Sequence, residues 1–365
     1  MLDKQYGTRT VPNGVNDEVV AENLKTYFDT KVKTIYDGIK TSTQLSDQAI
    51  SSQPGSKIHL TEFEEVSQPD LIQLIRGMPS KSSQLDVLPM WLFKNCLTEL
   101  IDIVHYIVSL SLKTGAFPSL LKSALIRPGL KKPTLDADEL KNYRPISNLT
   151  YLSKIIEKTV HLQLTKYTDT NELLSKFQSG YRKEHSCETA VTRIHNDILM
   201  MVDKRDNVVL LLLDLSAAFD TINHTLLLQK LNDLYGIQGN VLKWLESYLK
   251  DRSFKVSVGK SSSSSCWLQI GVPQGSILGP LLFIMYTRDL EAIVTKYGFS
   301  IHLYADDTQV YFAFDEHSNN PDLSAVKLCF DEIKRWMALN FLKLNDDKTE
   351  FIDIGPYQSP IQSLS

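Results

Sequence analysis

The sequence lacks the signatures of several protein classes. Its four cysteines, Cys96, Cys187, Cys266 and Cys329, form no C-x-x-C pair, and no cysteine–histidine group has zinc-ligand spacing. The first ten residues contain no basic start followed by an apolar run, so they do not resemble a secretory signal. The longest unbroken aliphatic run, Val208–Leu213, is far shorter than the roughly 20 residues that cross a bilayer. We therefore expect a soluble, intracellular protein with free thiols and no membrane partner.

The sequence also lacks an excess of positive charge. The 365 residues carry a formal net charge of -4, yet a chain that is acidic overall can still bind nucleic acid if one groove is positive. Basic residues are concentrated between Lys122 and Arg144, a segment that contains six basic and three acidic residues. Two interpretations stay open for this segment, a solvated loop and a surface that binds phosphates.

Apolar periodicity predicts a mixture of helices and strands, of the α/β or α+β class. Thr61 and Glu64 have capping-box spacing, which predicts a helix beginning there. The other predicted helices are Val19–Ile39, Pro89–Lys113, 150–166, two within Thr225–Asp251, Ile277–Leu290 and Leu323–Leu339. The predicted strands are Ser123–Arg127, Val208–Leu213, Phe254–Val258, Cys266–Val272, Ile301–Tyr304, Thr308–Phe314 and Phe351–Ile354.

Asp214 ends the most apolar strand of the sequence. Six aliphatic residues precede it, a pattern typical of a strand buried on both faces. A carboxylate at the end of such a strand is costly unless a cation or hydrogen bonds stabilise it. Taken alone, the segment is more typical of an aspartate that caps the turn into a following helix.

A second acidic site lies at the tip of a predicted hairpin. The two arms, Ile301–Tyr304 and Thr308–Phe312, flank Ala305, Asp306 and Asp307. Favoured two-residue hairpin turns contain glycine, which is absent here. Two adjacent carboxylates repel each other unless a cation neutralises them, so this locally unfavourable choice indicates function rather than a solvated turn.

Neighbouring strands of one sheet would bring Asp214 close to Asp306 and Asp307. Three such carboxylates suit hard divalent cations, which prefer oxygen ligands. Two ions about 3.5–4 Å apart can activate an attacking hydroxyl and stabilise a leaving oxygen in phosphoryl transfer.

Six motifs in order resemble those of reverse transcriptases, over roughly Leu85–Gly355. Tyr304–Asp307 resembles the YxDD box, and Asp214–Asp220 resembles the first palm motif. Gly271–Ser276 resembles the motif between these two. Asn142–Ser147 resembles the fingers motif of retroelements without long terminal repeats, Phe177–Lys183 resembles the next motif, and Leu342–Glu350 resembles the motif after the YxDD hairpin. The implied relatives are of the LINE, jockey-like or chicken-repeat-like type.

The resemblance implies a metal-binding triad and a proton donor. Asp214, Asp306 and Asp307 resemble the triad, and the backbone carbonyl of Leu215 would join the metal shell. Lys348 resembles the lysine that protonates departing pyrophosphate, although a solvated surface lysine is an equal alternative. The implied cofactor is a pair of Mg²⁺ ions, with Mn²⁺ as a substitute.

The resemblance also implies a nucleotide site. Phe219 resembles the aromatic gate that rejects a 2′-hydroxyl, with a core aromatic as the alternative. Gln274 resembles a residue lining the sugar and base pocket, and Gly275 would allow close backbone approach. Arg144 resembles the arginine that binds the triphosphate, a role suited to a planar bidentate donor, and Arg182 would assist it.

The implied architecture is a right-hand polymerase with palm and fingers and with the thumb largely missing. We expect a polar N-terminal extension over residues 1–60, and fingers with a helical N-terminal part over 61–205. The palm would cover 206–355, with a helical insertion at 224–252, and 356–365 would be a truncated tail. The implied partners are an RNA template, a DNA primer and a dNTP, in the nucleus or cytoplasm.

Two rival interpretations remain. One is an RNA-dependent RNA polymerase, against which Phe219 argues. The other is a catalytically inactive, truncated retroelement remnant that at most binds RNA, because the thumb, an endonuclease and a ribonuclease H are not recognised in this sequence.

Overall fold

The computed structural model describes residues 16–42, 58–204, 207–314 and 323–355. Parts of the predicted N-terminal extension and the whole predicted tail, 356–365, lie outside these residues. The described residues form two compact units. The first unit draws on Met1–Ile35, Ser52–Tyr167 and His224–Gly279, and the second draws on Tyr36–Ser51, Thr168–Asn223 and Pro280–Ser365. The boundaries of these units differ from those of the predicted domains. The predicted domain division stays a prediction.

The first unit contains a five-stranded sheet with the order β2-β1-β5-β6, in which β7 also pairs with β5. β1 is antiparallel to β2 and parallel to β5. The strands are β1 (Ser123–Leu130), β2 (Tyr143–Asn148), β5 (Arg252–Val258), β6 (Ser261–Ser262) and β7 (Cys266–Leu268).

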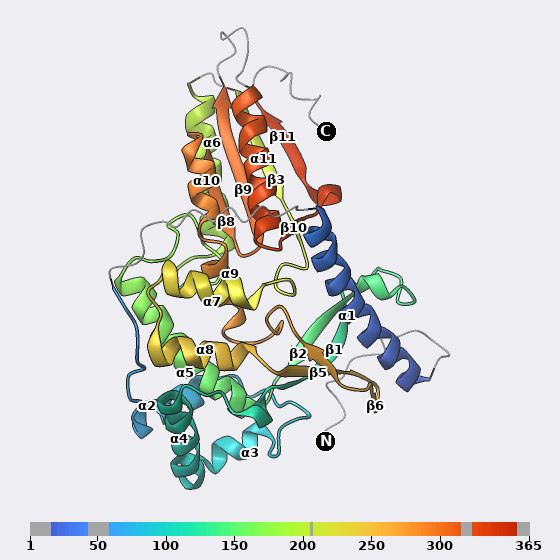
Figure 1. Cartoon of the computed structure of the whole chain (residues 1–365), viewed down its shortest axis with the longest axis vertical. Helices are drawn as coiled ribbons and strands as arrows, with labels where there is room; N and C mark the ends of the chain where they lie inside the picture. The colour runs from blue at the N-terminus through green and yellow to red at the C-terminus, as the bar shows by residue number, and fades with distance from the viewer. Residues whose placement is uncertain (1–15, 43–57, 205–206, 315–322, 356–365) are drawn as a thin grey trace. The chain divides into compact units, whose positions relative to one another are not determined.

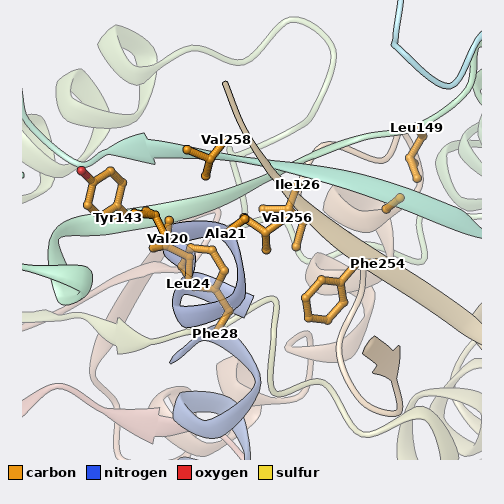
Figure 2. Packing of buried hydrophobic residues seen from close by; sticks show 11 residues of the cluster. Val20, Ala21, Leu24, Phe28, Ile126, Tyr143, Leu149, Phe254, Val256 and Val258 are labelled. Atoms are coloured by element: carbon orange, nitrogen blue, oxygen red, sulfur yellow. The ribbon is translucent and has the colours of Figure 1, made fainter. Parts of the chain in front are cut away.

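The N-terminal part of helix α1 (Asp17–Ser42) covers one face of this sheet. Its apolar residues recur at helical spacing, so they lie on one stripe that packs against the strands, as Figure 2 shows. The buried cluster consists of Val20, Ala21, Leu24, Phe28, Ala124, Ile126, Tyr143, Leu149, Phe254, Val256 and Val258. On the opposite face of the sheet, Arg144 and Lys255 are exposed, while Leu125 is buried.

Helices form the rest of the first unit. α4 packs against α2 and α8, and α8 packs against α7. Trp244 and Tyr248 of α8 are fully buried and stack on each other with ring centroids 5.5 Å apart. The helices are α2 (Gln68–Gly77), α3 (Met90–Asn95), α4 (Leu97–Thr114), α5 (Tyr151–Thr170), α7 (His224–Asp233) and α8 (Gly239–Leu249), and short 3-10 turns occur at Ser119–Leu121 and Leu140–Asn142.

The second unit is built on an antiparallel sheet with the order β11-β3-β9-β8. Helix α6 packs against β3, β8 and β9, and the Tyr311 hydroxyl of β9 donates to Asp197 of α6 at 2.6 Å. Figure 1 shows α6, α10 and α11 beside this sheet. The strands are β3 (Asn207–Leu213), β8 (Ser300–Tyr304), β9 (Asp307–Phe314) and β11 (Glu350–Ile354). The helices are α6 (Cys187–Val202), α9 (Gly279–Tyr286), α10 (Leu290–Lys296) and α11 (Leu323–Leu339), and β4 (Leu215–Ser216) pairs with β10 (Lys343–Leu344).

The predicted mixture of helices and strands is confirmed, including the 301–314 hairpin and the helix Leu323–Leu339. The helix predicted to begin at Thr61 is wrong. Leu60 instead pairs with Ile237, and the Thr61 carbonyl accepts the Asn240 amide at 2.8 Å. Helix α2 begins seven residues later, where the Ser67 side chain accepts the Asp70 amide. Long-range backbone bonds therefore override the local capping signal.

All four cysteines are free. Within the described part of the chain, no helix combines the length and the apolar character that crossing a membrane requires.

Candidate active site

The predicted catalytic residues of the second unit meet at one end of its sheet. β3 and β9 pair in antiparallel register as far as Leu213 and Thr308. Asp214 follows the first of these residues and Asp307 precedes the second, so the two aspartates occupy facing positions at the strand ends. Residues far apart in the chain are thereby brought together by strand pairing alone.

Asp306 lies in a two-residue turn between β8 and β9. Tyr304 pairs with Asp307, which leaves Ala305 and Asp306 to make the connection. Ala305 has a φ of 59°, a left-handed conformation that costs an L-residue roughly 1–2 kcal/mol. The turn therefore holds a strained, non-glycine residue directly before the acidic pair, and backbone strain of this kind is often found at functional sites.

Asp306 and Asp214 both act electrostatically on Asp307. Asp307 is an exposed residue, yet partial burial raises its pKa above the ordinary value, and the charges of Asp306 and Asp214 raise that pKa further. The Lys348 ammonium acts in the opposite direction. Like charges that raise a carboxyl pKa favour a bound cation or proton, so this cluster is prepared to accept positive charge.

Asp214 is held in place by the segment that follows α11. The Asn345 side-chain amide and the Lys348 ammonium both donate to the same carboxylate oxygen, Oδ2, at 2.9 and 3.1 Å. The Asn345 backbone amide also donates to the Asp214 carbonyl at 2.9 Å. Lys348 belongs to a 3-10 turn, Asp346–Lys348, and its side chain is 66% exposed. The only cation bonded to Asp214 among the described residues is thus an exposed lysine on a short turn.

This donor set suits divalent ions that are completed by substrate. In the described residues, no three acidic, histidine or cysteine side chains are grouped tightly enough to hold an ion by themselves. Mg²⁺ usually takes one or two carboxylates, keeps water and completes its shell with substrate phosphates. Asp214 and Asp307 on facing strands, with Asp306 beside them, match that requirement, and their mutual repulsion gives the physical reason for a cation there.

Phe219 belongs to a group of three aromatic residues in the second unit. Its ring stacks on Phe283 at 4.7 Å and meets Tyr181 edge to face at 6.2 Å. Burial raises the pKa of the Tyr181 phenol, and the neighbouring Asp306 and Asp307 carboxylates raise it further. Phe219 lies in a turn, is only partly buried, and does not begin a helix. Its ring therefore contacts Tyr181, the residue whose phenol is influenced by the acidic pair.

Two further predicted site residues of the second unit, Arg182 and Leu215, bond to or pair with neighbouring parts of the chain. Arg182 donates from Nη1 to the Ser175 carbonyl at 2.8 Å and to the Gln178 carbonyl at 3.4 Å, which supports its own loop. Leu215 is buried and pairs with Leu344 in the short sheet of β4 and β10. The predicted roles of Arg182 at the triphosphate and of the Leu215 carbonyl at the metal stay predictions.

The other predicted nucleotide-binding residues form a second set, within the first unit. Arg144 is exposed on β2, three residues before Ser147. The Ser147 amide donates to the Gln274 carbonyl at 2.8 Å, so the two motifs touch. Gly275 has a φ of 109°, and a Cβ there would lie 2.6 Å from the Ser147 carbonyl oxygen. Gly275 thus permits a close backbone approach to Ser147, while its role at the nucleotide stays a prediction.

The sequence reasoning missed three residues of this site. Asn345 binds Asp214, Tyr181 supports Phe219, and Gln178 contacts the Ala305 turn. All three lie within motifs that the sequence already singled out. The only available signal was the presence of uncharged polar and aromatic side chains inside those motifs, since their partners are far away in the chain.

Comparison with known proteins gives one matching family model and several relatives. Residues 130–364 match the family model described as "Reverse transcriptase (RNA-dependent DNA polymerase)". The chain is 29% identical over 80% of its length to the "Probable RNA-directed DNA polymerase from transposon BS" of Drosophila melanogaster. It is 34% identical over 54% of its length to the "RNA-directed DNA polymerase from mobile element jockey", and 28% identical over 90% of its length to the "Probable RNA-directed DNA polymerase from transposon X-element", both of the same fly.

The chain spans only 33%, 22% and 36% of the lengths of these three relatives. The resemblance to jockey-like mobile-element polymerases is confirmed by these matches. Together with the match over residues 130–364, they show that the chain belongs to the reverse transcriptase (RNA-dependent DNA polymerase) family.

Proposed function

We propose that this chain carries the nucleotidyl-transfer site of an RNA-directed DNA polymerase from a jockey-like mobile element without long terminal repeats. The substrates are an RNA template, a DNA primer and a dNTP. The reaction joins the primer 3′-hydroxyl to the α-phosphate of the dNTP and releases pyrophosphate.

One observation supports the proposal above all others. The register of β3 and β9 puts Asp214 opposite Asp307, and Asp306 is in the adjoining turn. A structural acidic turn would have no need of a third carboxylate facing it, because the added charge raises the pKa of Asp307 and opposes its ionisation. The arrangement is accounted for if the cluster works with bound cations.

The cofactor in this proposal is a pair of Mg²⁺ ions, held by Asp214, Asp306 and Asp307 with the Leu215 carbonyl. When bound, the ions lower the pKa of the attacking hydroxyl and neutralise charge on the leaving pyrophosphate. The chain's own residues orient the carboxylates, and the Phe219 ring bounds the space for the sugar.

Three residues act on the phosphates and the base in this proposal. Arg144 binds the triphosphate with two parallel donors. Gln274, on a loop bonded to Ser147, lines the sugar and base pocket. Lys348 donates a proton from Nζ to the leaving pyrophosphate, for which it must leave Asp214 Oδ2. An exposed lysine on a short turn can make this movement.

Primer extension tests the proposal directly. The protein, incubated with Mg²⁺, dNTPs and a DNA primer annealed to a heteropolymeric RNA, is expected to extend the primer in a template-dependent sequence. A protein that binds the RNA–DNA hybrid but adds no nucleotide would favour the inactive remnant. Equal use of ribonucleotides and deoxyribonucleotides would favour an RNA polymerase.

Replacing Lys348 with glutamine is expected to lower kcat by about 10²-fold, the lower end of the range for general acid–base catalysis, with the KM for dNTP less affected. Rapid-quench measurement of single-nucleotide addition gives the rate of the chemical step. The matched control is Lys327→Gln, which removes an exposed lysine of α11. If both variants retain the wild-type rate, Lys348 is a surface lysine and the proton comes from elsewhere.

A further inference from the structure

A second segment runs beside the catalytic hairpin and bonds to it. Phe177–Gly180 comes alongside β8, where Gln178 forms a parallel bridge with Leu303. The Leu303 amide donates to the Phe177 carbonyl at 2.9 Å, and the Ser179 amide donates to the Leu303 carbonyl at 2.8 Å. These bonds fix the segment against the last residues before the turn.

The Gln178 side chain reaches past the end of β8 to the turn itself. Its Oε1 accepts the Ala305 amide at 3.1 Å, and its Nε2 approaches the Ala305 carbonyl at 3.4 Å. The same Oε1 accepts the Gly180 amide at 2.7 Å. The side chain is only 2% exposed, so water does not compete easily for these bonds.

The turn requires such support because its first residue is in an unfavourable conformation. Ala305 has a φ of 59° without being glycine. Gly180 lets the supporting segment come close, since a Cβ at Gly180 would overlap the Ala305 backbone nitrogen. Two bonds from one buried amide thus tie the strained residue to a neighbouring loop, and the bond from Gly180 holds that amide in place.

We propose that Gln178 is a positioning residue for the catalytic aspartates: its amide holds Ala305 in the left-handed conformation and so sets the direction of Asp306 and Asp307. The proposal rests on the proposed function, because it assigns Gln178 to the same polymerase site. Gln178 touches no reacting atom. It acts through the backbone of the residue that directly precedes the acidic pair.

The test compares Gln178→Leu, Ala305→Gly and the double variant with the wild type. Leucine keeps much of the side-chain bulk and removes all three hydrogen bonds. Glycine adopts a positive φ readily, so a turn that carries the Ala305→Gly change needs less support. Gln163→Leu is the matched control, because the Gln163 amide makes the same two-point contact, to the Glu64 amide and carbonyl at 2.9 and 3.0 Å, in the other unit.

Gln178→Leu is expected to lower kcat for nucleotide addition by roughly 10–100-fold, as a small misplacement of catalytic groups does, while the KM for dNTP stays nearly constant. In a protein that already carries Ala305→Gly, adding Gln178→Leu is expected to lower kcat by about three-fold or less, since the two sites are coupled. Gln163→Leu is expected to leave kcat unchanged. If Gln178 merely fills space, the Ala305→Gly change would not restore kcat in the double variant.

Amide hydrogen exchange gives a readout that does not depend on activity. The Ala305 amide is expected to exchange roughly ten-fold faster in Gln178→Leu, because one buried hydrogen bond is lost, while the β8–β9 ladder amides keep their protection. Unchanged exchange at Ala305, an unchanged kcat, or an equal loss of kcat with and without the Ala305→Gly change would each overturn the proposal. If the wild-type protein adds no nucleotide, the proposed function fails, and the exchange comparison still decides whether Gln178 holds the turn.

Discussion

Replacing Asp306 with asparagine is expected to lower kcat for nucleotide addition by at least about 10³-fold. A bound divalent ion contributes several kcal/mol of transition-state stabilisation, and each ~1.36 kcal/mol is a factor of ten in rate. Asparagine has nearly the same shape as aspartate, so the turn between β8 and β9 is retained while one negative charge is lost. Single-turnover primer extension on an RNA template, with the concentration of Mg²⁺ varied, measures both the rate and the metal requirement.

Asp203→Asn is a suitable control for this experiment. Asp203 is an exposed aspartate at the end of α6 in the same unit, and it has no part in the proposed site. The control is expected to extend primers at the wild-type rate. Equal incorporation by Asp306→Asn and the wild type would remove Asp306 from the metal site.

Replacing Phe219 with valine is expected to reduce the preference for deoxyribonucleotides over ribonucleotides by roughly 10²-fold, because selection through a steric clash is lost with the clashing group. The ring packs against Phe283 and Tyr181, and these contacts would oppose its movement away from a 2′-hydroxyl in the proposed site. Valine leaves space for that hydroxyl. The ratio of kcat/KM for dATP to that for ATP, on a template that requires adenine, reports the change.

Phe330→Val removes a comparable, partly buried ring from α11, where it packs against Phe351 rather than at the site. This control is expected to keep the wild-type preference. A wild-type protein that already uses both nucleotides equally would contradict the gate assignment, as would a Phe219→Val variant that still rejects ATP.

The elements that carry the catalytic aspartates could be predicted because their signals are local. The aliphatic run Val208–Leu213 predicts β3, and the alternation on both sides of Asp306 predicts the hairpin. Strand pairing then requires only that the two elements be neighbours, as they are. The metal-binding hypothesis could therefore be formed from the sequence, because each strand that carries an aspartate has its own local pattern.

Some features could not be predicted because they depend on distant partners, and others because their local signals are weak. The helix expected at Thr61 gives way to backbone bonds with Ile237 and Asn240, which lie far along the chain. The helix expected over Pro89–Lys113 is divided at Cys96 into α3 and α4. Helix α6 has its capping box at Ser186 and Thr189, with threonine in the place usually taken by glutamate, and was not predicted.

The supporting residues of the site show the same limit. Gln178 and Asn345 are uncharged, and nothing in their neighbourhoods in the sequence identifies Ala305 and Asp214 as their partners. The contacts of their side chains can be identified only once the positions of β8, β9 and the turn after β10 are known. Sequence patterns thus identified the charged groups, and the structure was needed to identify the groups that hold them.

Binding of Mn²⁺ followed by electron paramagnetic resonance tests the central claim most directly, because it counts ions without requiring turnover. The protein is titrated in the presence of a dideoxy-terminated DNA primer on RNA and the next dNTP. We expect the wild type to bind two Mn²⁺ ions that Mg²⁺ displaces, and both Asp214→Asn and Asp306→Asn to lose at least one of them. Wild-type stoichiometry and affinity in Asp214→Asn would show that Asp214 does not share a metal site with the aspartates of the turn, and would contradict the account.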